Sequence, residues 1–225
     1  MMRAINAGGY TIHIEAANQK APVIYIHVLS QFVQSVVPSL SKVYDGPVSV
    51  VTVEVPVDEW SNILAPWNTP EGWPQYVACT GGANEYAKTF LNEIMPAAEQ
   101  NLDVSDRYIA GYSLAGLFAL YLFTKTDKFK SAACPSGSFW FPNFGTWFDK
   151  QELKRIPTAV FFSCSRDEYY SDNEYLAPVR DNLKLIEQKL KKAGTKTAFV
   201  LDAGDHYEDV LQRTVYALCW VLRHA

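Results

Sequence analysis

The stretch that decides the fold is Asp106-Arg-Tyr-Ile-Ala-Gly-Tyr-Ser-Leu-Ala-Gly116, which contains the pattern Gly-x-Ser-x-Ala-Gly. Its first half predicts a short apolar strand, and the residues after Ser113 predict an apolar helix. A serine at a sharp turn between a strand and a helix is well presented as a nucleophile. Gly111 and Ala115 are small enough for such a turn, and the amide of Leu114 would point toward a developing oxyanion. The stretch therefore predicts acyl transfer at Ser113 if the chain also supplies a base and an acid.

The composition is typical of a globular protein. The chain has 225 residues, of which 48% are hydrophobic and 20% charged, so we expect a single domain over residues 1–225. The net charge of −4 disfavours nucleic acid as a partner. No apolar run approaches the roughly 18 residues that would span a bilayer, and the N-terminus lacks a signal-peptide core. We expect a cytoplasmic protein without membrane contact, although a secreted chain after signal removal would look the same. The oligomeric state stays open.

Strand-like and helix-like segments alternate along the chain, as in a mostly parallel sheet covered by helices on both faces. We expect Pro96 to kink a helix or to start a new helical turn. The stretch 56–80 is rich in proline and tryptophan and is expected to be irregular. The predicted strands are 10–15 (at the sheet edge), 23–29, 48–55, 107–112, 129–134, 158–164 and 197–201, and the predicted helices are 82–101, 114–123, 175–192 and 207–223.

A base and an acid are expected at the carboxyl ends of strands beyond Ser113, because functional groups of parallel-sheet hydrolases gather there. Two histidines follow Ser113. His224 is the penultimate residue and a poor candidate, whereas His206 follows the last predicted strand and is the expected base. Asp167, just past the strand 158–164, is the expected acid. Its neighbour Glu168 would point in a different direction.

Several motifs together resemble those of the putative-esterase group of α/β-hydrolases, which includes enterochelin-esterase-like, feruloyl-esterase-like and esterase-D-like enzymes. The motifs cover most of the chain from about Pro22 onward. They are the serine turn, Asn92-Glu-Ile-Met-Pro96, Ser136-Gly-Ser-Phe-Trp140, Ser165-Arg-Asp-Glu168 and Gly204-Asp-His206. The resemblance implies the α/β-hydrolase fold without a large separate lid domain. It also implies that Ser113 is the nucleophile, Asp167 the acid and His206 the base.

One oxyanion amide is expected from Leu114, and a second from Leu29 in the loop after the strand 23–29. The family often has His-Gly-Gly there, whereas this chain has His27-Val-Leu-Ser30, so its oxyanion loop must follow a different backbone path. Aromatic residues are concentrated in two strand-end loops. From these loops we expect Trp67 and Trp140 to contact the substrate, although most of the rings could simply cap the core.

Two isolated side chains have less specific interpretations. His27 lies at a strand end, where it could bind substrate but is more often a packed core residue. Cys79 lies in a loop and could be reactive, whereas Cys134, Cys164 and Cys219 are expected in the core. The spacing of the cysteines fits no metal site.

The function predicted from the sequence is hydrolysis of a small-molecule carboxylic ester through an acyl-enzyme, with a Ser-Asp-His triad and without metal or cofactor. Two alternatives remain. The same triad could transfer the acyl group to another alcohol, because that choice depends on how well water is excluded. A non-catalytic binding protein could also retain the fold.

Overall fold

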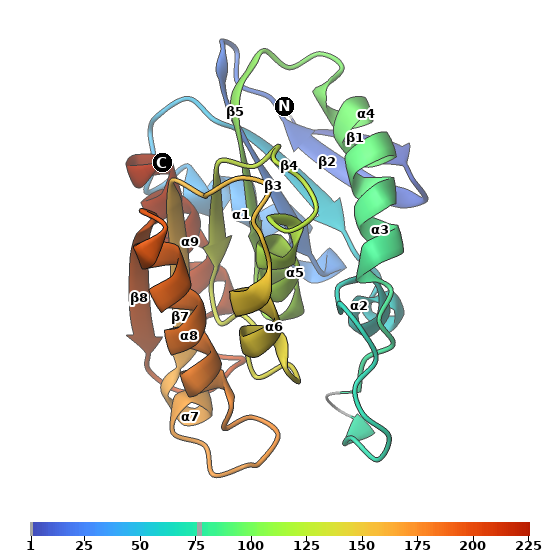
Figure 1. Cartoon of the computed structure of the whole chain (residues 1–225). Coiled ribbons are helices and arrows are strands. Elements are labelled where there is room, and N and C mark those ends of the chain that lie inside the picture. Colours follow the sequence, from blue (N-terminus) through green and yellow to red (C-terminus); the bar gives the residue numbers. More distant parts are fainter. Residues whose placement is uncertain (1, 76–77) are drawn as a thin grey trace.

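A single eight-stranded sheet forms the centre of the molecule in the computed structural model, which describes residues 2–75 and 78–225 (Figure 1). The strand order is β1-β2-β4-β3-β5-β6-β7-β8. β1 and β2 pair antiparallel with their neighbours, and the strands from β4 to β8 pair parallel. The strands are β1 Arg3–Ala7, β2 Tyr10–Glu15, β3 Ala21–Val28, β4 Ser49–Glu54, β5 Val104–Gly111, β6 Ser131–Cys134, β7 Ala159–Ser165 and β8 Lys196–Asp202.

Helices cover both faces of the sheet (Figure 1). One face packs against α1 and α9, and the other packs mainly against α3, α5, α6 and α8. No helix among the described residues is long and apolar enough to cross a membrane. The helices are α1 Val33–Leu40, α2 Val57–Ile63, α3 Ala83–Thr89, α4 Met95–Glu99, α5 Leu114–Leu122, α6 Phe144–Lys150, α7 Arg166–Tyr169, α8 Val179–Lys192 and α9 Val210–His224, with a 3-10 turn η1 Ser30–Phe32 and a π-helical turn η3 Phe90–Ile94.

The central strands are mostly apolar because helices bury them from both sides. In β3, Val23 and Tyr25 face the α3 and α5 side, whereas Ile24 and Ile26 face the α1 and α9 side. All four side chains are fully buried. This double burial fixes where β3 and β5 end, and therefore where the loops at their carboxyl ends meet.

The structure differs from the sequence prediction in four places. β2 is not the sheet edge, because β1 pairs with its outer side. The stretch predicted to be irregular after β4 begins with the helix α2, and α1 follows β3 although Pro38 lies inside it. The predicted helix 82–101 is divided by η3, which precedes Pro96 at the start of α4. Because proline has no amide hydrogen, a wider π turn before it accommodates the missing helical bond.

Candidate active site

Ser113 occupies a sharp turn between β5 and α5. Its backbone has φ 59° and ψ −126°, a conformation that few residues other than glycine adopt. The turn is possible only because its neighbours are small. A Cβ added to Gly111 would lie 2.5 Å from the carbonyl carbon of Ala115, and one added to Gly116 would lie 2.8 Å from the carbonyl oxygen of Gly111. Backbone strain and close packing thus hold the Ser113 hydroxyl above the end of the sheet.

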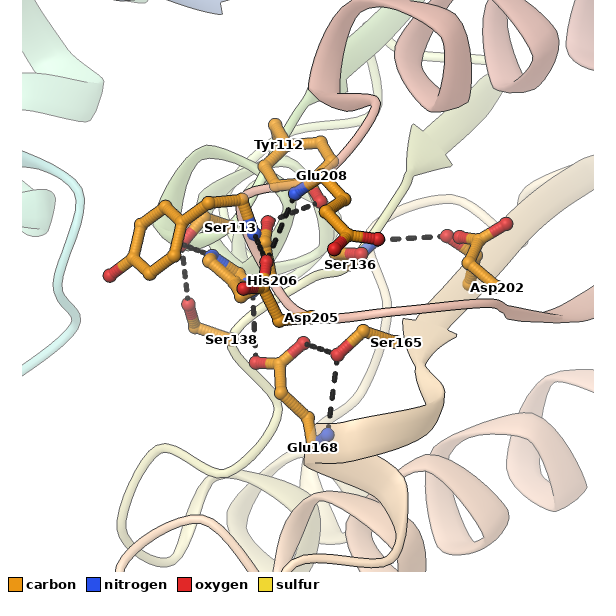
Figure 2. A network of polar contacts seen from close by, with 12 residues as sticks. Tyr112, Ser113, Ser136, Ser138, Ser165, Glu168, Asp202, Asp205, His206 and Glu208 are labelled. Atoms are coloured by element: carbon orange, nitrogen blue, oxygen red, sulfur yellow. Dashed lines mark hydrogen bonds and ion pairs between the residues drawn. The ribbon is translucent and has the colours of Figure 1, made fainter.

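The expected base lies within reach of this hydroxyl. His206 Nε2 is 3.0 Å from Ser113 Oγ, although the two residues are 93 positions apart in the chain (Figure 2). His206 sits in the loop between β8 and α9, beside the carboxyl ends of the strands. His224, the other histidine after Ser113, instead hydrogen-bonds the carbonyl of Trp220 within α9.

A buried arginine and a tyrosine hold the His206 loop in place. Arg213, which is 7% exposed, donates hydrogen bonds to the carbonyl oxygens of Ala203 at 2.5 Å and Asp205 at 2.8 Å. It also donates to the hydroxyl of Tyr112 at 3.1 Å, and Tyr112 in turn donates to the carbonyl oxygen of His206 at 2.8 Å. This support was not predicted from the sequence, where its only signal is a charged residue on the apolar face of α9.

The carboxylate beside His206 belongs to Glu168 and not to Asp167. Glu168 Oε1 lies 2.9 Å from His206 Nδ1, and the Glu168 side chain is almost completely buried (Figure 2). Asp167 is exposed, and its backbone amide donates to the carbonyl oxygen of Gly204 at 3.4 Å. The prediction of Asp167 as the partner of His206 was therefore wrong by one residue.

The reason is the short helix α7, which begins directly after β7. Ser165 is its N-cap: the Ser165 hydroxyl accepts the amide hydrogen of Glu168 at 3.2 Å and donates to Glu168 Oε2 at 2.8 Å. This is the Ser-x-x-Glu pattern of a helix start, in which the first and fourth residues bind each other. The pattern turns Glu168 inward and Asp167 outward. The sequence Ser165-Arg-Asp-Glu168 contained this signal.

Comparison with known proteins identifies the family of the chain. The chain matches the family described as "Putative esterase" over residues 9–210. The chain belongs to this esterase family. It is a carboxylic ester hydrolase. No curated protein sequence matches it.

Solved structures of similar fold include several hydrolases. The siderophore hydrolase EstA from Aspergillus nidulans has a TM-score of 0.75 at 18% identity, with 99% of this chain and 93% of that chain covered. An IroE-like serine hydrolase from Shewanella oneidensis has a TM-score of 0.78 at 17% identity, with 99% and 80% covered. The BES protein from Bacillus cereus has a TM-score of 0.74 at 22% identity, with 98% and 94% covered. At these identities the likeness establishes the α/β-hydrolase fold of the esterase.

A cavity of about 740 Å³ opens over Ser113 and His206 in the esterase. Leu29 and Leu114 both line it. The loop and turn hydrogen bonds recorded among the described residues use neither of their backbone amides. Both amides are thus available at the cavity.

The two tryptophans predicted to contact substrate are placed differently. Trp140 lines the cavity and is 6% exposed. Trp67 lies outside the cavity lining. Its ring nitrogen donates to the carbonyl oxygen of Pro142 at 3.1 Å, and its ring packs against Phe141 and Trp147. Trp67 therefore joins its loop to the loop after β6, which is a packing role, whereas Trp60 of α2 lines the cavity.

His27 and Cys79 also line the cavity. The His27 ring is 1% exposed and packs edge-on against Phe90 and Phe118 at centroid distances of 4.8 and 5.3 Å. Burial lowers the pKa of His27 to about 3, so it is neutral at physiological pH. Burial also raises the pKa of the Cys79 thiol to about 12, which keeps it protonated and a poor nucleophile.

The residues that the structure describes offer no evident metal site near the serine. Among the described residues, no three His, Cys, Asp or Glu side chains are grouped closely enough to hold a metal ion. The Ser113 hydroxyl lies within hydrogen-bonding distance of His206 Nε2 and of the Ser138 hydroxyl.

Proposed function

We propose that the esterase hydrolyses its ester through an acyl-enzyme formed on Ser113, with His206 as general base and acid and Glu168 as the carboxylate that orients His206. The observation that carries this proposal is the continuous series of contacts from Ser113 Oγ to His206 Nε2 at 3.0 Å and from His206 Nδ1 to Glu168 Oε1 at 2.9 Å. Serine acyl transfer requires a nucleophile in contact with a base, and an acid that orients this base from its other side.

The negative charge of Glu168, 2.9 Å from Nδ1, favours the tautomer of neutral His206 that carries its proton on Nδ1, which leaves Nε2 free to accept the Ser113 proton. The Ser113 oxygen then attacks the ester carbonyl while its proton moves to Nε2. Glu168 stabilises the positive imidazolium that results. His206 returns the proton to the leaving alcohol, and a water molecule activated by His206 releases the acid in the second half of the reaction.

The negative charge on the carbonyl oxygen requires donors at the cavity. We assign this role to the amides of Leu114 and Leu29. Leu114 is the first residue of α5, where amides have no acceptor within the helix and the helix dipole is positive. Trp140 is proposed as a wall of the substrate site, because its ring lines the same cavity. The proposed substrate is a small carboxylic ester.

The proposal is tested with p-nitrophenyl acetate under conditions where acylation outpaces deacylation. We expect a burst of nitrophenol close to one equivalent per chain, and an acetylated chain detected by intact mass spectrometry after rapid acid quench. Ser113→Ala should lose both the burst and the adduct while keeping its melting temperature. Hydrolysis that persists in Ser113→Ala would refute the assignment of the nucleophile.

A further inference from the structure

A second serine lies against the proposed nucleophile. Ser138 Oγ is 3.1 Å from Ser113 Oγ, and Ser138 is 1% exposed (Figure 2). Ser113 Oγ therefore has two polar neighbours, His206 Nε2 on one side and the Ser138 hydroxyl on the other. The two serines are 25 positions apart, so the fold and not the local sequence brings them together.

The loop after β6 fixes Ser138 in this position through the backbone. The amide of Ser138 donates to the carbonyl oxygen of Ser113 at 3.1 Å, and the amide of Ser113 donates to the carbonyl oxygen of Pro135 at 3.4 Å. Ser136, at the turn of the loop, has φ 41° and donates its amide hydrogen to Ser163 Oγ at 3.1 Å. Gly116 of α5 also packs closely on this loop, since a Cβ there would lie 3.2 Å from the Cα of Gly137. The nucleophile turn and the Ser138 loop thus form one rigid unit.

The positions of the protons give this contact a direction. Glu168 beside Nδ1 leaves Nε2 of His206 as an acceptor, and Nε2 takes its hydrogen bond from Ser113. Once the Ser113 proton points at His206, the Ser113 oxygen can only accept from Ser138. A hydroxyl offers one donor and two acceptor sites, so the series Ser138 to Ser113 to His206 satisfies every group. The reverse direction would take the proton of Ser113 away from its base.

We propose that Ser138 is a further catalytic residue, whose hydroxyl donates to Ser113 Oγ during both halves of the reaction. This inference rests on the proposed function. In acylation, the Ser113 O–H bond breaks toward Nε2, the Oγ–carbon bond forms, and the carbonyl electron pair moves to the carbonyl oxygen. Ser138 keeps its own proton throughout. Its hydrogen bond holds Ser113 in the reactive rotamer and stabilises the charge on Oγ before the new bond is complete.

The same contact acts in the second half of the reaction. When water has added to the acyl-enzyme, the Oγ–carbon bond breaks and negative charge returns to Oγ as it takes a proton from His206. The Ser138 hydroxyl again stabilises this charge. Hydrogen bonds to charged groups are stronger than those to neutral groups. The contribution of Ser138 is therefore larger in the transition states than in the resting enzyme, which is the condition for an effect on kcat.

The test compares Ser138→Ala with the wild type in hydrolysis of p-nitrophenyl acetate. We expect kcat and kcat/KM to fall together by about ten- to hundredfold, with KM changed by less than about twofold. Ser131→Ala is the matched control, because Ser131 is a fully buried serine of β6 whose hydroxyl donates to the Lys130 carbonyl and accepts from the Ala159 amide. This variant should lose folding stability while kcat stays within about twofold of the wild type.

The outcomes separate this inference from the proposed function. A folded Ser138→Ala enzyme with wild-type kcat would overturn the role of Ser138 and leave the triad intact. An inactive wild type would overturn both. Should Ser138→Ala fail to fold, Ser138→Cys keeps the size of the side chain with a weaker donor, and wild-type kcat in that variant would equally overturn the role.

Discussion

Replacing Glu168 by glutamine is the sharpest test of which carboxylate works with His206. Glutamine keeps the length of the side chain and can still contact Ser165, so the short helix α7 should keep its start. What is lost is the negative charge 2.9 Å from His206 Nδ1. The amide can also present its nitrogen to Nδ1, which favours the wrong tautomer of the imidazole. We expect a folded protein with greatly reduced kcat.

The size of the effect follows from the distance between the charges. At an effective dielectric constant of about 20, two unit charges 2.9 Å apart attract each other by roughly 5–6 kcal/mol. Because the imidazolium charge is spread over the ring, a mean separation of about 4 Å and an energy of about 4 kcal/mol are more realistic. These energies correspond to a loss of about 10³- to 10⁴-fold in kcat.

The assay is steady-state hydrolysis of p-nitrophenyl acetate, with circular dichroism and thermal melting to verify folding. Asp167→Asn is the matched control, because Asp167 is the adjacent residue, carries the same charge and is exposed. Its kcat should remain within about twofold of the wild type. If Asp167→Asn were inactive and Glu168→Gln fully active, the reasoning from the capping pattern of α7 would be refuted.

Three further results are expected. His27→Phe should be more acid-resistant than the wild type. In the unfolded chain His27 binds a proton below about pH 6.5, whereas the buried ring of the folded protein stays neutral to about pH 3. The free energy of unfolding of the wild type should therefore fall by about 3 kcal/mol between pH 7 and pH 4, a loss that the variant does not have. Urea unfolding at both pH values checks this, and equal losses would contradict it. Arg213→Met should lower the free energy of unfolding by about 2–4 kcal/mol and should also lower kcat, because three hydrogen bonds that support the His206 loop are lost. An unchanged kcat would show that the loop does not need these hydrogen bonds. Gly116→Ala should cost about 1–3 kcal/mol in urea unfolding, because the new methyl group would meet the backbone of Gly111; a fully stable variant would show that the turn can relax.

Much of the fold could be predicted because the central strands are buried on both faces. Continuous apolar runs such as the one in β3 can be recognised without knowing their neighbours. The edge strand β1 could not be recognised in this way, because its burial is partial and its identity depends on pairing with β2. The helix α1 was missed for a similar reason, since Pro38 lies inside it and its apolar face is meaningful only against α9.

Chain order constrains two residues of the candidate site. Ser113 and His206 follow from a turn motif and from the order of the strands, and the structure brings them to hydrogen-bonding distance. The choice between Asp167 and Glu168 depends on how one short helix begins, which strand counting does not resolve. Tertiary packing decides the positions of Trp67 and Ser138. It places Trp67, which was expected at the substrate, outside the cavity lining, and it places Ser138, which was not expected there, against Ser113.

The central claim is that Ser113 is a nucleophile activated by His206, and covalent labelling tests it most directly. A fluorophosphonate probe should modify the folded wild-type protein once per chain, and peptide mass spectrometry should place the adduct on Ser113. His206→Ala should retain its fold and lose the labelling. Modification at another residue, or no modification of the folded wild-type protein, would contradict the account.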